Sequence, residues 1–141
     1  MIARPAAFSW GRGALPALVC AAALTAAEPI KLGEIEPMTG KEDAFGPSSP
    51  RGVQLAIDEI NARGGVLGRP LVLVVEDSQS KAGDTATIAK KLVGRDKVVA
   101  IVSGGTSSAC LEAAPICQAA RVPFVATTAT APEVTEKRDY I

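Results

Sequence analysis

The sequence predicts a doubly wound α/β domain, in which one parallel sheet carries helices on both faces. Strand-like and helix-like segments alternate from residue 30 to residue 126. Two of the strand-like segments, 71–75 and 98–102, are apolar at every position, which is typical of strands that are covered on both sides. Repeated strand–helix–strand units of this length join parallel strands by right-handed crossovers. We expect the strand order 2-1-3-4.

The first part of this pattern runs from residue 30 to residue 75. Residues 30–35 form a short strand that ends before Pro37. A helix is expected to begin at Ser49, whose hydroxyl would cap it, with Pro50 at the first helical position. This helix has one apolar stripe at helical spacing, made of Val53, Ala56, Ile57 and Ile60. It ends at residues 64–65, two glycines, and strand 71–75 follows.

The second part is predicted as a helix over 81–93 capped by Ser80, a strand over 98–102, a helix over 107–120 and a strand over 123–126. Pro115 lies inside the last helix and predicts a kink or a separate first turn. Cys110 and Cys117 are seven residues apart in that helix, about 10 Å along its axis, which favours two buried thiols over a disulfide. The closing residues 140–141 favour the start of another strand.

The first 27 residues differ from the rest of the chain. Arg4 and Arg12 are their only charges, and an apolar run of about 14 residues, 14–27, follows. The run is shorter than the roughly 20 residues that span a bilayer, which favours a cleaved secretory signal over a membrane anchor. We therefore predict a signal peptide over 1–27, cleavage before Glu28, a ligand-binding domain over 28–141, and a periplasmic location.

Composition excludes several classes of function. Basic and acidic residues balance at 15 each, so no cationic excess exists for nucleic-acid phosphates. The chain has no histidine, which excludes a His base, a Ser-His pair and a His-ligated metal. No sequence forms a phosphate-binding loop or a dinucleotide fingerprint. We expect no enzyme, no cofactor, no metal and no nucleic-acid partner.

The predicted fold places a ligand site outside the carboxyl ends of the strands, where the strand order reverses. The loops that face this crevice are 37–46, 103–108 and 127–130. The second loop carries the hydroxyls of Thr106, Ser107 and Ser108 and leads into a helix, whose free N–H groups favour a carboxylate. Its alternative role is a helix cap with a flexible turn.

The third loop offers an ammonium seat. Thr128 and Thr130 supply hydroxyls and carbonyls, which are neutral acceptors for the three hydrogen bonds of an ammonium group. A binding position for a carboxylate next to one for an ammonium group suits an amino acid, which carries both groups. Phe45, in the first loop, either covers the apolar side chain of a ligand or fills the edge of the core. No acid–base pair is available, so the site is predicted to hold a ligand without converting it.

The chain resembles the amino-terminal lobe of the leucine/isoleucine/valine-binding proteins, the periplasmic receptors of branched-chain amino-acid ABC importers, which are type I periplasmic binding proteins. The resemblance runs from about residue 30 to the end, and the segments that carry it are 30–33, 37–40, 44–46, 51–56, 59–62, 64–66, 68–69, 75–77, 91–93, 114–115, 122–123 and 130–135.

The resemblance implies roles for individual residues. Ser107 matches the hydroxyl residue that holds the ligand carboxylate, and Thr130 matches the threonine that contacts both carboxylate and ammonium. The carbonyl of Thr128 matches an ammonium acceptor, and Phe45 falls where an aromatic ring meets the ligand side chain. The family has a second lobe, which this sequence does not contain, and a membrane ABC permease as its partner. The alternatives are the ligand-sensing domain of a receptor or of an amide-responsive regulator, and an α/β enzyme.

Overall fold

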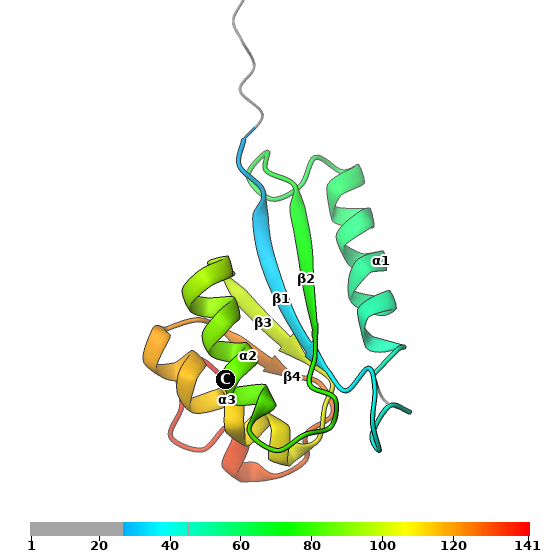
Figure 1. The fold of residues 1–141 in the computed structure, drawn as a ribbon. Helices are drawn as coiled ribbons and strands as arrows, with labels where there is room; N and C mark the ends of the chain where they lie inside the picture. The colour runs from blue at the N-terminus through cyan, green and yellow to red at the C-terminus, as the bar shows by residue number, and fades with distance from the viewer. Residues whose placement is uncertain (1–26, 45) are drawn as a thin grey trace, which may run out of the picture.

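The core of the protein is a parallel sheet. The computed structural model describes residues 27–44 and 46–141, and within them four strands pair: β1 (Ile30–Glu36), β2 (Leu71–Asp77), β3 (Ala100–Ser103) and β4 (Phe124–Ala126). All pairs are parallel, in the order β2-β1-β3-β4 (Figure 1). The predicted order is confirmed, and it places the carboxyl ends of β1, β3 and β4 side by side.

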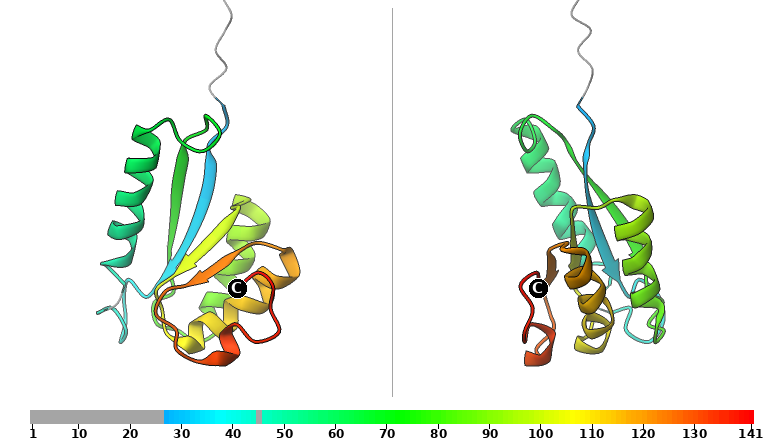
Figure 2. Two further views of the ribbon diagram at one scale, coloured as in Figure 1. Left: turned by 180° about the vertical axis from the view of Figure 1, so that it is seen from behind. Right: turned by 90° about the vertical axis from the view of Figure 1, so that its left-hand side faces the viewer.

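Helices cover both faces of this sheet, so the doubly wound architecture is confirmed. Helix α1 (Ser49–Ala62) lies against β1 and β2 on one face. Helices α2 (Asp84–Lys91) and α3 (Ser107–Ala120) pack against each other on the other face (Figure 2). Right-handed crossovers require this division, because the chain moves from β1 to β2 in one direction and from β2 to β3 in the other.

The main apolar core lies between the sheet and the pair α2 and α3. The buried side chains that form it come from β1, β3, β4, both helices and the segment that directly follows α2, and they include Ile35, Ile88, Ala89, Leu92, Ile101, Cys110, Ala113, Cys117 and Phe124. Gly33 lets the helix layer approach β1 closely, because a Cβ there would lie 3.0 Å from Cδ1 of Leu92. Cys110 and Cys117 are both free and buried, as predicted.

Two predicted helix caps are wrong. The N-cap of α1 is Ser48, and the hydroxyl of Ser49 donates to Glu34 instead, at 2.7 Å. Helix α2 begins at Asp84 rather than at residue 81, after Gly83 in a left-handed conformation with φ of 85°. The hydroxyl of Ser80 donates to the Thr39 carbonyl, 3.0 Å away. In both cases the hydroxyl forms a hydrogen bond with a residue of another element instead of capping its own helix.

The remaining boundaries differ by small amounts. Helix α2 continues into a short π-helical segment, Leu92–Asp96, and β3 begins two residues later than expected. Helix α3 is unbroken from Ser107 to Ala120 with Pro115 inside it, so the separate first turn is wrong. After a 3-10 turn, Pro132–Val134, the Tyr140 carbonyl accepts from the Phe124 N–H at 2.7 Å. Residues 140–141 therefore lie beside β4, although they are not a strand.

The predicted signal segment lies outside the described residues except for its last position. No helix within the described ranges is long and apolar enough to cross a membrane.

Candidate ligand-binding site

Hydrogen bonds join the loops that follow β3 and β4. The backbone N–H of Thr127 donates to the Ser103 carbonyl at 2.9 Å. The hydroxyl of Thr128 donates to the carbonyls of Gly104 and Gly105 at 2.5 and 2.8 Å. The two hydroxyl-rich segments therefore form one surface at the edge of the sheet, as their position after neighbouring strands predicts.

Ser107 and Thr130 lie together on this surface. The Ser107 hydroxyl oxygen accepts from the N–H of Thr130 at 3.1 Å and from the N–H of Ala131 at 3.2 Å. A serine hydroxyl has two lone pairs and one proton, so two accepted bonds leave its O–H to donate to a ligand. Ser107 is also the first residue of α3, where the N–H groups lack partners within the helix.

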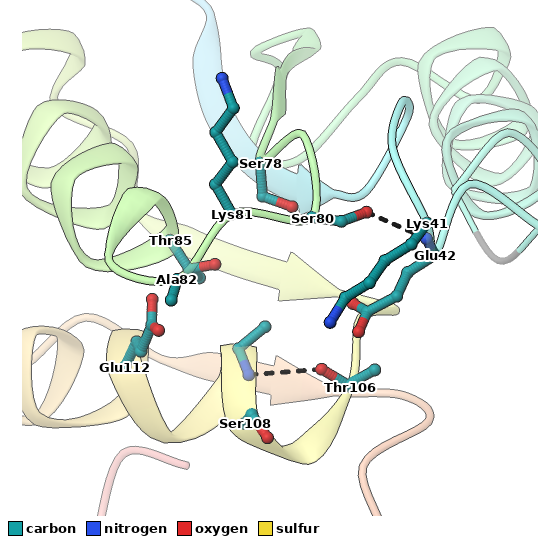
Figure 3. A pocket seen from close by; sticks show the side chains of 11 residues that line it. Lys41, Glu42, Ser78, Ser80, Lys81, Ala82, Thr85, Thr106, Ser108 and Glu112 are labelled. Atoms are coloured by element: carbon teal, nitrogen blue, oxygen red, sulfur yellow. Dashed lines mark hydrogen bonds between the residues drawn. The ribbon is translucent and has the colours of Figure 1, made fainter.

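The hydroxyls of Thr106 and Ser108, which were also predicted for the site, do not join the contact between Ser107 and Thr130. Thr106 is the N-cap of α3, and its hydroxyl accepts from the Ala109 N–H at 3.5 Å. It also borders a hollow of about 100 Å³ lined by Gly104, Gly105, Thr106 and Thr128. Ser108 instead lines a polar pocket of about 140 Å³, together with Thr106 (Figure 3). The opposite wall of that pocket comes from the loops after β1 and β2.

A larger pocket lies between α1 and the β4 loop. Its volume is about 430 Å³, within the usual range for small-molecule sites. One wall is the start of α1 and the preceding turn, with Ser48, Ser49, Gly52 and Val53, and the other is Gly104, Thr127 and Thr128. Gly104 and Thr128 line both this pocket and the 100 Å³ hollow, so the two spaces adjoin. None of the site residues predicted from the sequence comes from the α1 wall.

Asp77 holds the loop after β1 in place. Its carboxylate accepts from the backbone N–H groups of Met38 and Thr39 and from the Thr39 hydroxyl, which is 2.7 Å away. Partial burial works to raise the pKa of Asp77, but these bonds and one from the Gln79 N–H outweigh it and lower that pKa. Asp77, at the end of β2, therefore has a structural role: it fixes the loop after β1.

Two buried carboxyl groups underlie the larger pocket, and sequence reasoning missed them. Glu34 and Glu36 are fully buried on one face of β1. Glu34 accepts from Ser49, and Glu36 accepts a short hydrogen bond from the Gly104 N–H. Burial raises the pKa of both, that of Glu36 to about 7, against the opposing effect of these bonds. The signal available in the sequence was two glutamates two residues apart in a central strand, because residues at that spacing point to the same face of the sheet.

Phe45, the remaining predicted contact, lies outside the described residues.

Comparison with known proteins identifies the family. A family model described as "Periplasmic binding protein" matches residues 29–140. The Leu/Ile/Val-binding protein BraC3 of Rhizobium johnstonii is 35% identical over 108 residues, which cover 77% of this chain and 29% of that protein. Leu/Ile/Val-binding protein homolog 7 of Brucella suis is 34% identical over 130 residues, covering 87% of this chain and 32% of that protein.

Solved structures agree with the sequence relatives. A branched-chain amino acid transporter substrate-binding protein from Streptococcus pneumoniae, in complex with isoleucine, matches with a TM-score of 0.76 and 36% identity over 79% of this chain and 32% of its own. A solute-binding protein of an ABC transporter from Rhodopseudomonas palustris, in complex with 3,4-dihydroxybenzoic acid, matches with a TM-score of 0.73 and 30% identity, covering 80% and 31%.

This chain belongs to the periplasmic binding protein family. It has the type I fold, and its relatives are Leu/Ile/Val-binding proteins, so the resemblance seen in the sequence is confirmed. These relatives are substrate-binding proteins rather than enzymes. The chain spans about 29% of the length of the first curated relatives that it matches.

Proposed function

We propose that this chain is the amino-terminal ligand-binding lobe of a periplasmic solute-binding protein. It would bind a branched-chain amino acid, or a similar small zwitterion or amide, and deliver it unchanged to a membrane ABC permease. The observation that carries the proposal is the contact between Ser107 and Thr130, 3.1 Å apart between hydroxyl oxygen and backbone nitrogen at the start of α3. The proposal includes export of residues 28–141 after cleavage of the signal peptide.

Each polar group has a distinct role in this proposal. The Ser107 O–H and the free N–H groups of α3 hold the ligand carboxylate, because both are donors at the positive end of a helix. The Thr130 side chain, which is exposed, contacts carboxylate and ammonium. The Thr128 carbonyl accepts from the ammonium group. Thr106 supports the turn as the N-cap, and Phe45 covers the apolar side chain of the ligand.

The Rhodopseudomonas palustris relative favours a second candidate ligand, an aromatic carboxylate, because its structure holds 3,4-dihydroxybenzoic acid. Both ligand classes carry a carboxylate, which Ser107 and the α3 N-terminus would receive in the same way. They differ in the ammonium group, whose acceptor here would be Thr128. A ligand that lacks an ammonium group would not use the Thr128 carbonyl as an acceptor.

Calorimetry on the complete gene product tests the proposal. Isoleucine, leucine and 3,4-dihydroxybenzoate are titrated into the wild type, Ser107→Ala and Thr130→Ala. Each variant should lose about five- to 150-fold in affinity, because a ligand charge left without its partner costs about 1–3 kcal/mol. Thr87→Ala is the matched control, since Thr87 is exposed on α2 and its hydroxyl donates to the Gly83 carbonyl at the start of that helix.

The outcomes separate the candidates. Binding of isoleucine or leucine that weakens in both variants supports the amino-acid receptor. Binding of the aromatic acid alone replaces it with the second candidate. Unchanged affinity in Ser107→Ala and Thr130→Ala removes these residues from the site.

A further inference from the structure

We propose that Glu34 and Glu36 are positioning residues for the ligand pocket. They share one proton, and this completes a hydrogen-bonded chain from Gly104 through Glu36 and Glu34 to Ser49. The chain ties the two walls of the 430 Å³ pocket to each other from beneath, and its integrity sets the affinity for ligand. The link to affinity rests on the proposed function, whereas the shared proton does not.

The two ends of this chain are residues of the pocket itself. Ser49 lines the α1 wall, and its hydroxyl donates to one oxygen of Glu34 at 2.7 Å. Gly104 lines the opposite wall, and its N–H donates to one oxygen of Glu36. The fit at Gly104 is close, because a Cβ there would lie 2.8 Å from that same oxygen. The carboxyl pair thus contacts both walls.

The middle of the chain requires a proton. The second oxygens of Glu34 and Glu36, their Oε2 atoms, are buried and have no donor among the described residues. The two side chains nevertheless lie within hydrogen-bonding reach of each other, and the charge of Glu34 raises the pKa of Glu36. A buried acceptor without a donor costs about 1–3 kcal/mol. One proton between the two Oε2 atoms satisfies both at once.

The other groups around the pair do not replace this proton. From α1 the pair meets the Ser49 hydroxyl. On α3, burial together with the charge of Glu36 raises the pKa of the Cys110 thiol, which shares no hydrogen bond with the pair among the described residues. On β2, Asp77 is in register with Glu36 but directs its carboxylate to the loop after β1. On β3, Val102 is in register with Glu34 and is apolar. Neither ion pair found among the described residues involves the pair.

Loss of the shared proton leaves two negative charges in contact inside the protein. Two like charges within hydrogen-bonding reach repel strongly in a medium of low polarity, and the repulsion pushes Glu34 and Glu36 apart. Because each carboxylate holds one wall, the walls then separate or lose their bonds to Gly104 and Ser49. Ligand affinity is therefore expected to fall as the pH rises.

The pH dependence has a definite size. If only the protonated pair supports binding and its proton leaves at pH 7, about 3% of the protein is competent at pH 8.5 and about 90% at pH 6. The apparent dissociation constant for isoleucine then rises about thirtyfold between these values. Glu36→Gln carries an amide that donates to Glu34 and accepts from Gly104 at every pH, so this variant should keep one affinity throughout. Glu36→Leu has no polar side-chain atom and so cannot restore the hydrogen-bonded chain between Gly104 and Ser49.

The test has one arm without ligand and one with it. Carboxyl and amide NMR of the complete gene product, from pH 5 to 9, follows the glutamate side chains and the Gly104 N–H. Calorimetry with isoleucine follows affinity at pH 6 and 8.5 in the wild type, Glu36→Gln and Glu36→Leu. Glu59→Gln is the matched control, because Glu59 is exposed on α1.

A Gly104 amide that titrates near neutral pH in the wild type but not in Glu36→Gln supports the shared proton, and loss of affinity over the same range supports positioning. Both carboxyls titrating in the ordinary range, or affinity that is equally pH-dependent in Glu36→Gln, overturns the proposal. If no variant binds isoleucine at any pH, the proposed function fails and the link to affinity fails with it. The Gly104 titration still decides whether the proton is shared.

Discussion

The pH dependence of stability can be worked out from Glu36. Its pKa is raised from 4.5 to about 7 by burial. Between these values the folded protein keeps a proton that the unfolded chain releases, so the free energy of unfolding falls as the pH rises. The contribution is fully present below pH 4.5 and is lost once the pH has passed 7. At 1.36 kcal/mol for each pH unit, it amounts to about 3 kcal/mol.

Glu36→Gln isolates this contribution. Urea denaturation of the wild type and the variant at pH 4.5, 5.5, 7 and 8 gives the free energy of unfolding of each. Relative to the variant, the wild type should lose about 3 kcal/mol between pH 4.5 and 8, most of it by pH 7 and only the small remainder above. Carboxyls outside the coupled pair titrate equally in both proteins, so the difference reports on Glu36 together with its partner Glu34. Glu59→Gln should follow the wild type.

Parallel wild-type and Glu36→Gln curves would refute the reasoning, because they would mean that Glu36 titrates alike in the folded and unfolded states. A wild type that gains stability relative to the variant from pH 4.5 to 7 would refute it more strongly. That result would require a cation or a donor beside Glu36 strong enough to overcome burial.

Three further predictions concern other parts of the chain. Phe124→Ala should lower the free energy of unfolding by about 3–5 kcal/mol in denaturant titrations, since it empties a buried position in the main core; a loss below 1 kcal/mol would contradict the packing. Asp77→Asn should cost about 1–3 kcal/mol at neutral pH. The difference should vanish in acid, because the advantage of a carboxylate with a lowered pKa is lost as the pH falls through that pKa. Cys117, whose thiol pKa is raised to about 11 by burial, should resist iodoacetamide at pH 8 until the protein unfolds, as peptide mass mapping would reveal.

Much of the fold could be predicted because it depends on local patterns. Residues 71–75 and 98–102 are apolar throughout, which predicted two strands. The expectation that both are covered on both sides is wrong in part, because Val72, Val75 and Val99 are exposed. The apolar stripe that includes Ile57 predicted the first helix. The preference for right-handed crossovers between parallel strands then limited the possible strand orders. Boundaries were less predictable. Ser80 and Ser49 are good capping residues by type, but each bonds to a residue on another element.

The candidate site was predictable to the extent that strand ends define it. Ser107 and Thr130 follow neighbouring parallel strands, so their meeting follows from the strand order alone. Thr106 and Ser108 were chosen by the same argument, but successive residues at a helix start point in different directions, and Ser108 therefore lines another pocket. No residue of the α1 wall was predicted, because nothing local indicates which residues of a helix face loops far along the chain.

The amino-acid sequence by itself determined the class of fold and the order of the strands, and with them the edge of the sheet where the candidate site lies, since these follow from periodicity and chain connection. Only the tertiary structure decided what lies beneath that edge. Glu34 and Glu36 read as ordinary strand residues in sequence, and their burial, their contact with each other and their bonds to Ser49 and Gly104 exist only once α1 and the β3 loop close over them. The protonation of a carboxyl group depends on the solvent and charges around it, which the folded chain alone supplies.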